Sequence, residues 1–481
     1  MSGPGRVLVV DVGTSSVRAA VVDRDARLVV EHRRPLLPGS PAPGLVELDG
    51  AATAAAVLDL ARAALDEAGP VDAVGIAAQR ASTLVWDRAT GDPVAPGIGW
   101  QDLRTVGRCL ELRPDLVLTP NQSATKLEAI LDQVDRDRRA DLCFGTVDTW
   151  VAWTLSAGRL HVTDASNAAV TGLRTGSNDG WAAPTLSRLR IPERMLPAVV
   201  DSTGVLGPAA ALAGQPPIAG LLGDQQASLL GQGCVRPGDA KITFGTGGML
   251  DVVVGDRPRF DRGRAGTFVI VTRRATGRDT WGLEAIMLAA GTSVEWLRDG
   301  LALIPDPAAS DDLARQCADT GDVWFVPALL GLGTPDWDHG ARGALLGVTR
   351  GTTRAEIVRA VLEGVAHRGA DLVDAATVDA GRPIGTLRVD GGMSANPTFV
   401  QALADATQRP VEISPVREAT ALGAAFAAGL AVGVWPDDDT VAATWAPAAR
   451  VDPARVLDRE RWRDARARAA AWIPELSAID L

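Results

Sequence analysis

The chain has 481 residues, of which 46% are hydrophobic and 22% charged, and its formal net charge is −11. These values describe an ordinary globular protein long enough for two domains, and the acidic balance argues against a nucleic-acid partner, because binding phosphates requires a basic face. The first residues lack the long apolar core of a signal peptide, and the uncharged stretch 421–435 is too short to span a bilayer. We therefore expect a cytoplasmic protein that does not enter a membrane.

The first predicted element is a β-hairpin formed by residues 7–12 and 17–23, whose tip carries Asp11, Gly13 and three hydroxyl groups. The arms are β-branched and mostly apolar, which is typical of buried strands. Gly13 permits a tight turn whose N–H groups face an anion, and Asp11 is placed to face a cation. The hairpin tip is therefore predicted to bind phosphate and a metal ion.

A similar pattern occupies residues 240–254, where Gly245 and Thr246 form the turn between two further strands. Two similar phosphate turns imply two similar domains. We place the boundary between residues 228 and 238, which divides the chain into domains 1–232 and 233–481.

The other predicted elements alternate between strands and helices, which indicates α/β layers around a mixed sheet. In the first half we expect a strand at 28–35, a helix at 49–68 that Asp49 caps, a strand at 71–78 and a loop region at 197–217. In the second half we expect helices at 290–300, 354–375 and 396–406, a buried helix at 421–435, and strands at 323–326, 387–390 and 411–413.

Asp224 follows an apolar run at the predicted junction of the two domains, where a cleft would open. A carboxylate in such a cleft can orient a hydroxyl group and accept its proton during phosphoryl transfer. The alternative role of Asp224 is to cap a helix. Arg80 ends the strand 71–78 and is expected to face the cleft, unless it is a solvated surface arginine. Trp100 is either a flat wall for an aliphatic ligand or a core residue.

Lysine is nearly absent, since only Lys126 and Lys241 occur. Neither lysine follows a glycine, so the chain has no Walker A loop, and it also lacks the His-Arg-Asp tripeptide of protein kinases. Several common classes of nucleotide-binding protein are thereby excluded.

Nine segments in order along the chain resemble the FGGY carbohydrate kinases, and among them most closely the glycerol kinases. Besides the three glycine turns at 13–16, 245–248 and 390–392, the resemblance rests on Trp86-Asp87 with Thr90-Gly91, Trp100 with Arg104, 144–150, 161–164 with Asn167, 223–226, 331–335 with Trp337-Asp338, and 420–425. It covers nearly the entire chain.

The resemblance implies an actin-like ATPase fold, in which two ribonuclease-H-like domains hold ATP and Mg²⁺ in the cleft between them. It also implies that Asp224 is the general base and that a homodimer or homotetramer forms. The remaining roles that it implies are metal binding by Asp11 and Asp224, phosphate binding by Thr14, Ser15, Arg18, Gly245 and Thr246, and nucleotide binding by Gly291, Gly392 and Asn396.

The acceptor pocket departs in part from the glycerol-kinase pattern. Arg80, Trp100, Asp224 and Gln225 match that pattern, but Ala81 stands in place of a glutamate, Asn121 in place of a tyrosine and Met249 in place of a phenylalanine. These changes predict a roomier pocket that has lost an acceptor for substrate hydroxyl protons, and Asn121 is able to contact an additional hydroxyl or a keto group.

Three interpretations follow from these residues. The first is an ATP-dependent kinase for a hydroxyl group of glycerol or a closely related small polyol, and the second is a kinase for a longer polyol or ketose of four or five carbons. The third is a nucleotide-dependent binding or chaperone-like protein. The resemblance also bears on regulation: 208–217 corresponds to the glycine-rich loop through which a sugar bisphosphate inhibits some glycerol kinases, and 255–272 to the segment that carries a phosphorylated histidine in some members of the family. Because 208–217 lacks a glycine run and 255–272 contains no histidine, we expect neither inhibition by fructose 1,6-bisphosphate nor control by phosphohistidine.

Overall fold

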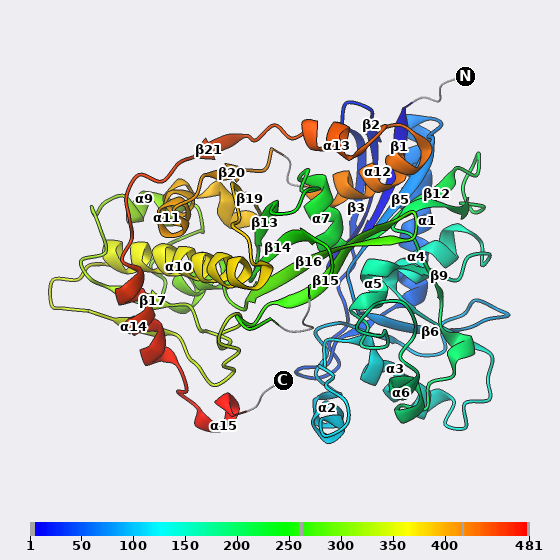
Figure 1. Ribbon diagram of the computed structural model, residues 1–481, viewed down its shortest axis with the longest axis horizontal. Helices are drawn as coiled ribbons and strands as arrows, with labels where there is room; N and C mark the ends of the chain where they lie inside the picture. Colours follow the sequence, from blue (N-terminus) through cyan, green and yellow to red (C-terminus); the bar gives the residue numbers. More distant parts are fainter. Residues whose placement is uncertain (1–4, 259–262, 416–417, 479–481) are drawn as a thin grey trace.

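Residues 5–258, 263–415 and 418–478 are described by the computed structural model, which is a mixed α/β protein (Figure 1). Within these residues the main sheet has thirteen strands in the order β21-β20-β19-β13-β14-β16-β15-β11-β12-β5-β1-β2-β3. Its two halves meet where β11 (Thr203–Pro208) pairs with β15 (Phe268–Ala275) through the single residue pair Thr203 and Ala275. Each half of the chain therefore builds a largely separate set of strands.

The first hairpin is confirmed: β1 (Arg6–Val12) runs antiparallel to β2 (Ser16–Asp23), with Asp11 opposite Arg18. The predicted strand β3 (Leu28–Pro35) lies beside β2, while β5 (Ala73–Ala78) and β12 (Pro217–Gly223) extend the sheet in parallel from β1. β1, β5 and β12 are almost entirely buried, which explains their continuous apolar runs.

Helices cover both faces of the first-half strands. On one face lie α1 (Gly50–Ala68) and α4 (Val147–Leu155), and α1 begins at the predicted cap, where the Asp49 side chain accepts from the Ala52 N–H at 2.9 Å. On the other face lie α7 (Asp224–Gly231) and α12 (Ala419–Val432). The predicted buried helix is thus confirmed as α12, which belongs to the second half of the sequence but packs on strands of the first half (orange among blue strands in Figure 1).

α7 and α12 cross at very short distance because each presents a glycine to the other. A methyl group on Gly423 would overlap the backbone carbonyl of Ala227, and one on Gly231 would overlap the carbonyl of Ala419. Any larger residue at either position must push the two helices apart. The position of α7, and of the loop that precedes it, therefore depends on these two glycines.

The rest of the first half forms a smaller sheet and several short helices. The sheet has the order β4-β7-β6-β8. The elements are β4 (Glu47–Leu48), β6 (Thr83–Asp87), β7 (Gly97–Ile98), β8 (Leu142–Thr146), β9 (Val162–Asp164), β10 (Ala198–Val200), α2 (Val106–Leu112), α3 (Ser123–Val134), α5 (Ala165–Ala169), α6 (Ala183–Arg188) and the 3₁₀-helix η1 (Glu193–Met195).

The predicted loop region 197–217 is wrong in part, because it contains β10 and β11. Its glycines and prolines indicated turns, but β11 tolerates them through an irregularity in its pairing with β12 between Thr203 and Gly207. Such a bulge is a usual place for glycine in a strand.

The second half repeats the pattern of strand, Gly-Thr turn and strand. β13 (Ala240–Phe244) and β14 (Gly248–Gly255) form the predicted hairpin, flanked by β16 (Arg278–Met287) and by the parallel strand β19 (Leu387–Asp390). β20 (Val411–Ile413) and β21 (Ala449–Val451) complete this edge. α10 (Arg354–Ala380) and α11 (Pro397–Thr407) pack on one face, against Ile242, Leu250 and Ala285.

Two predicted helices of this half differ in extent. α10 continues to Ala380, because Gly381 ends it only there in the left-handed conformation at φ 62°. The segment 290–300 is α-helical only in α8 (Gly291–Glu295) and continues as the π-helix η2 (Trp296–Gly300). The remaining elements are α9 (Ala309–Ala314), β17 (Trp324–Val326), β18 (Ala344–Leu346), the 3₁₀-helix η3 (Gly392–Ala395), α13 (Asp438–Ala443), α14 (Arg459–Ala469) and α15 (Pro474–Ser477).

No helix within 5–258, 263–415 and 418–478 combines the length and the apolar character needed to cross a membrane.

Helix α14, near the C-terminus, packs on α10 through charged side chains. Asp371 of α10 accepts from Arg368 at 2.8 Å, from Arg459 at 2.6 Å and from Arg466 at 2.8 Å. Burial alone would raise the pKa of Asp371, but the three guanidinium groups lower it to about 2.

Replacing Asp371 by asparagine is expected to lower the free energy of unfolding by about 3–5 kcal/mol, because buried guanidinium groups lose their counter-charge. A depressed pKa stabilises the folded state above the unfolded value of about 3.9, and this contribution is lost as the pH falls toward about 2. Urea unfolding at pH 7 and pH 5 should give the same difference. Asp374→Asn, which removes an exposed partner of Arg459, should cost less than about 1 kcal/mol. Equal losses in the two variants would contradict this account.

Candidate active site

The first phosphate turn is closed by a hydrogen bond from the Gly13 N–H to the Ser16 carbonyl at 3.0 Å. Thr14 is half-buried and Ser15 is exposed at the tip, so both are accessible to a ligand. Trp100 reaches this turn, because its Nε1–H donates to the Thr14 hydroxyl at 3.2 Å. With 38% of its surface exposed, Trp100 is not a core residue. The structure therefore brings the predicted acceptor wall and the predicted phosphate turn together.

Asp11 and Arg18 face each other on β1 and β2 behind this turn. Burial, together with the neighbouring carboxylates of Asp224 and Glu418, raises the pKa of Asp11 to about 7 against the opposing effect of Arg18. The Arg18 guanidinium lies 3.6 Å from Asp11 and 3.1 Å from Glu31, and it also pairs with Glu418. Arg18 thus has three carboxylate neighbours, and its contact with phosphate stays a prediction.

Asp11 and Asp224 fit a magnesium ion by their chemistry. Among the described residues, no group of three or more His, Cys, Asp or Glu side chains is arranged to hold a metal ion alone. Mg²⁺ usually takes only one or two carboxylates and completes its shell with water and substrate phosphates. Repulsion from Asp224 contributes to the raised pKa of Asp11, and a cation bound by both carboxylates would relieve it.

The second phosphate turn is tied to the start of α8. Gly245 and Thr246 are exposed between β13 and β14, and their carbonyls accept from the N–H groups of Gly291 and Ala290, both at 2.9 Å. A methyl group on Gly291 would lie 2.6 Å from the Gly245 carbonyl oxygen, so glycine is required there for the close approach. The structure thus places Gly245, Thr246 and Gly291 together, as predicted.

Gly392 and Asn396 lie at the turn that follows β19. Gly392 is exposed, with open space where a side chain would point, and its neighbour Gly391 has a φ of 87° that favours glycine. Asn396 caps α11 by accepting from the Phe399 N–H at 2.9 Å, and its amide donates to the Ser310 hydroxyl at 3.0 Å. Asn396 therefore has a structural role in addition to its predicted contact with a nucleotide.

Asp224 and Arg80 meet at the junction between the halves. The helix cap of α7 is Gly223, while Asp224 is the first helical residue and accepts only from its neighbour Gln225 at 2.8 Å among the described residues. Arg80 Nε lies 3.7 Å from Asp224 Oδ1, and Arg80 Nη2 donates to Glu284 at 2.6 Å. Burial raises the pKa of Asp224, although Arg80 opposes this. The capping and surface alternatives for these two residues are therefore wrong.

Three charged residues of this site were missed by the sequence analysis. Lys241, Asp251 and Glu284 occupy directly opposed positions on β13, β14 and β16 and are at least nine-tenths buried. Lys241 Nζ lies 2.8 Å from Asp251 and donates to Gln225 Oε1 at 2.7 Å. For Lys241 and Asp251, a single charge within a mostly apolar strand is the signal that could have identified them, whereas β16 carries two further charges besides Glu284.

The three substituted wall residues lie on three different segments, namely the loop after β5, the loop before α3 and strand β14. Ala81 has a φ of 61°, and its carbonyl accepts from the Ser123 hydroxyl at 3.0 Å, which ties it to the loop that carries Asn121. Asn121 is exposed and its side-chain oxygen accepts from Thr119. Met249 is half-buried on β14, two residues before Asp251 and on the same face of the sheet.

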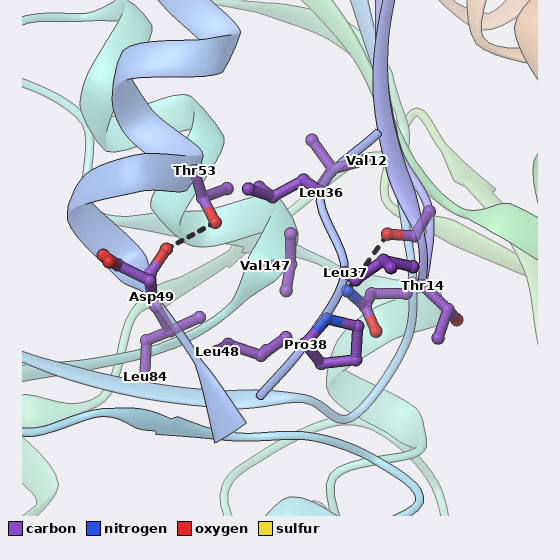
Figure 2. A pocket seen from close by; sticks show the side chains of 12 residues that line it. Val12, Thr14, Leu36, Leu37, Pro38, Leu48, Asp49, Thr53, Leu84 and Val147 are labelled. Carbon is purple, nitrogen blue, oxygen red and sulfur yellow. Dashed lines mark hydrogen bonds between the residues drawn. The ribbon is translucent and has the colours of Figure 1, made fainter. Parts of the chain in front are cut away.

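A small cavity of about 30 Å³ lies behind the first turn (Figure 2). Its walls are mostly apolar side chains, such as Leu36, Leu48 and Val147. Inside it, Gln79 donates to the Gly13 carbonyl at 3.3 Å and Thr53 donates to the Asp49 carbonyl at 2.7 Å. A space of this size holds one or two water molecules and no nucleotide. The cavity therefore lies beside the first turn, and Asp224 is not among the residues that line it.

Comparisons with known proteins agree with this geometry. The sequence models of the FGGY family of carbohydrate kinases match residues 6–231 with the N-terminal domain and 240–432 with the C-terminal domain. Glycerol kinase of Trichlorobacter lovleyi is 42% identical, over 97% of this chain and 99% of its own length. Glycerol kinase 2 of Thermotoga maritima is 41% identical, also over 97% of this chain and 99% of its own length.

Solved structures support the same conclusion. The structure of Plasmodium falciparum glycerol kinase with ADP superimposes with a TM-score of 0.89 at 27% identity, covering 99% of both chains. Xylulose kinase from Rhodospirillum rubrum, at 23% identity and a TM-score of 0.84, covers 98% of this chain and 99% of its own and shows the fold alone. The expected actin-like ATPase fold is confirmed, and the chain belongs to the FGGY family of carbohydrate kinases.

Proposed function

We propose that this kinase transfers the γ-phosphoryl group of ATP to a hydroxyl group of glycerol or a closely related small polyol. The observation that carries the proposal is the contact between Asp224 and Arg80 at the junction of the halves, where the charge of Asp224 also acts on Asp11 behind the first phosphate turn. The names of the relatives that are about 42% identical over nearly the whole chain favour glycerol as the acceptor.

In this proposal Asp224 orients the acceptor hydroxyl and takes its proton. The hydroxyl oxygen forms a bond to the γ-phosphorus while the bond from that phosphorus to the β-phosphate oxygen breaks, and ADP leaves. The raised pKa of Asp224 makes it a stronger base than a solvated aspartate, which suits proton transfer near neutral pH. Arg80 binds an acceptor oxygen, and Mg²⁺, when bound at Asp11 and Asp224, neutralises phosphate charge.

We further propose that residues 1–232 and 233–481 act as two domains that close around the substrates and exclude water. The single residue pair that joins the two halves of the sheet supports this division. Closure would protect ATP from hydrolysis before the acceptor arrives. We also infer a cytoplasmic homodimer or homotetramer, which light scattering during gel filtration would test.

A second candidate is a kinase of a four- or five-carbon polyol or ketose. Ala81, Asn121 and Met249 favour it, because they replace larger or charged wall residues of the glycerol-kinase pattern. The third candidate, a chaperone-like nucleotide-binding protein, requires no acceptor pocket, and the buried Arg80 beside Asp224 argues against it.

Release of ADP from MgATP distinguishes the candidates. The purified protein would be assayed with glycerol, dihydroxyacetone, tetritols, pentitols and ketopentoses. Strong turnover with a three-carbon acceptor supports the proposal, and preference for a longer one supports the second candidate. ATP hydrolysis without any polyol, stimulated by peptides, would favour the third.

Gly291→Ala is expected to raise the KM for ATP about tenfold or more. The added methyl group would press on the Gly245 carbonyl, and overpacking of this kind costs about 1–3 kcal/mol. Steady-state kinetics at saturating acceptor would measure the change. Gly385→Ala, where a methyl group meets open space, is the matched control and should leave the KM unaltered. An unchanged KM in a folded Gly291→Ala protein would remove this turn from the ATP site.

A further inference from the structure

A layer of paired charges lies directly beneath the acceptor residues. Lys241, Asp251 and Glu284 stand side by side on three neighbouring strands. They alternate with residues such as Ile242 and Leu250, which face the apolar core under α10, so the charged side chains point to the opposite face, toward α7 and Arg80. Glu284 is paired with Arg80, and Asp251 with Lys241, so the layer is neutral without Asp224.

Lys241 uses its ammonium group to hold three oxygens. Its Nζ lies 2.7 Å from Gln225 Oε1, 3.0 Å from the Thr243 hydroxyl and 2.8 Å from Asp251 Oδ2. Burial alone would lower the pKa of Lys241, but Asp251 and Asp390 raise it above its usual value. The amine therefore stays protonated in the interior.

The charge of Lys241 fixes the orientation of the Gln225 amide. The oxygen and the nitrogen of a glutamine amide are similar in size, so the amide fits in either of two orientations. An ammonium group only donates hydrogen bonds and therefore selects one of them. The Gln225 oxygen must therefore face Lys241, which leaves the Nε2–H groups on the other side. No residue in the described ranges accepts a hydrogen bond from Gln225 Nε2, and Arg80 Nη1 is buried without a partner there.

The acceptor end of the site consequently offers hydrogen-bond donors from Gln225 and Arg80. The position that would carry a second acceptor in the glycerol-kinase pattern is Ala81, and Glu284 is engaged by Arg80. Asp224 receives the proton of the reacting hydroxyl. A secondary alcohol bound between Gln225 and Arg80 brings a proton of its own to two groups that only donate hydrogen bonds, whereas a ketone oxygen only accepts them.

We propose that Lys241 is a positioning residue, which turns the Gln225 amide so that the site prefers an acceptor with a ketone beside the reacting hydroxymethyl group over the corresponding secondary alcohol. This inference rests on the proposed phosphorylation of small polyhydroxyl compounds. Leaving a buried hydroxyl proton unpaired is expected to disfavour the alcohol about 10- to 100-fold in kcat/KM.

Two pairs of acceptors that differ only at this carbon would test the proposal, namely dihydroxyacetone with glycerol and erythrulose with erythritol. In the wild-type protein the ketone of a pair should have at least about a tenfold higher kcat/KM. If the polyol is used better in both pairs, the inference is overturned while the proposed function stands. If no member of either pair is phosphorylated, both are overturned.

Variants distinguish a positioning role of Lys241 from a role in stability alone. The double variant Lys241→Met with Asp251→Leu replaces the ion pair by apolar residues of similar size, while the neighbouring Asp390 keeps its hydrogen bonds from Ser228 and Gln232. The double variant should lower the ratio of kcat/KM for the ketone to kcat/KM for the polyol about tenfold or more, because the KM for the ketone rises. The KM for ATP should stay within about threefold of the wild-type value. Thr243→Val removes only the hydroxyl that Lys241 also contacts and keeps the contacts of Lys241 with Gln225 and Asp251, so its ratio should equal that of the wild type. Equal ratios in all three proteins would contradict the assigned role, and so would a KM for ATP that rises as much as the KM for the ketone.

Discussion

Replacing Asp224 by asparagine should lower kcat about 10²- to 10⁴-fold, the usual contribution of a general base. Asparagine keeps the shape of the side chain but cannot take the proton of the acceptor hydroxyl. The KM for MgATP should change much less than kcat, because Asp11 and the phosphate turns at Gly13 and Gly245 are untouched. ADP release at saturating MgATP and acceptor measures the effect.

The folded state should tolerate this change. Burial already disfavours the charged form of Asp224, and Glu284 continues to hold Arg80, so the unfolding temperature is not expected to fall. Asp299→Asn, which removes an exposed carboxylate on η2, is the matched control and should retain full activity. An Asp224→Asn protein that keeps more than about a tenth of the wild-type kcat would exclude a general-base role.

Gly423→Ala should destabilise the protein by about 3 kcal/mol or more, at the upper end of what overpacking usually costs. The reason is that the new methyl group meets the rigid backbone carbonyl of Ala227 rather than a side chain that can move. Because α12 also carries Glu418 next to Arg18 at its start, the displacement should reach the active site and lower activity as well. Thermal and urea unfolding give the size of the loss.

Gly107→Ala is the control for this prediction. Gly107 also lies within a helix, α2, but a methyl group there meets nothing within 4 Å. Alanine is the better helix former, so this variant should gain up to about 1 kcal/mol. A Gly423→Ala protein as stable as the wild type would contradict the prediction, because it would show that α7 and α12 can move apart to fit a methyl group at little cost.

The sequence predicted the parts of the fold that depend on local signals. The hairpins β1–β2 and β13–β14 were evident because apolar, β-branched arms flank a glycine turn, and α1 because Asp49 caps an alanine-rich helix. β11 was missed, since its glycines and prolines look like a loop until its pairing with β12 and β15 is seen. The packing of α12 on the first-half sheet depends on contacts across the whole chain, which no local pattern carries.

Some residues of the active site could likewise be recognised from local signals, whereas others depend on contacts between distant parts of the chain. Asp224, Arg80 and Trp100 each follow a recognisable strand or turn, so roles could be predicted for them from the sequence. The structure pairs Asp224 with Arg80 and Trp100 with Thr14. Lys241 and Asp251 gave no local signal of their partnership. They become neighbours only through the register of β13 and β14, which also places them under Gln225.

Lys126 and Lys241 are the only lysines of the protein, and neither has any solvent-exposed surface. Reagents that acylate or reductively alkylate amines should therefore find no lysine to modify in the native state, apart from the terminal amine of the chain. Each lysine then becomes a chemical probe for exposure of its surroundings. Mass-spectrometric labelling of Lys241 would report opening of the strands below the acceptor site, and labelling of Lys126 would report opening around α3, in the same sample and without any engineered tag.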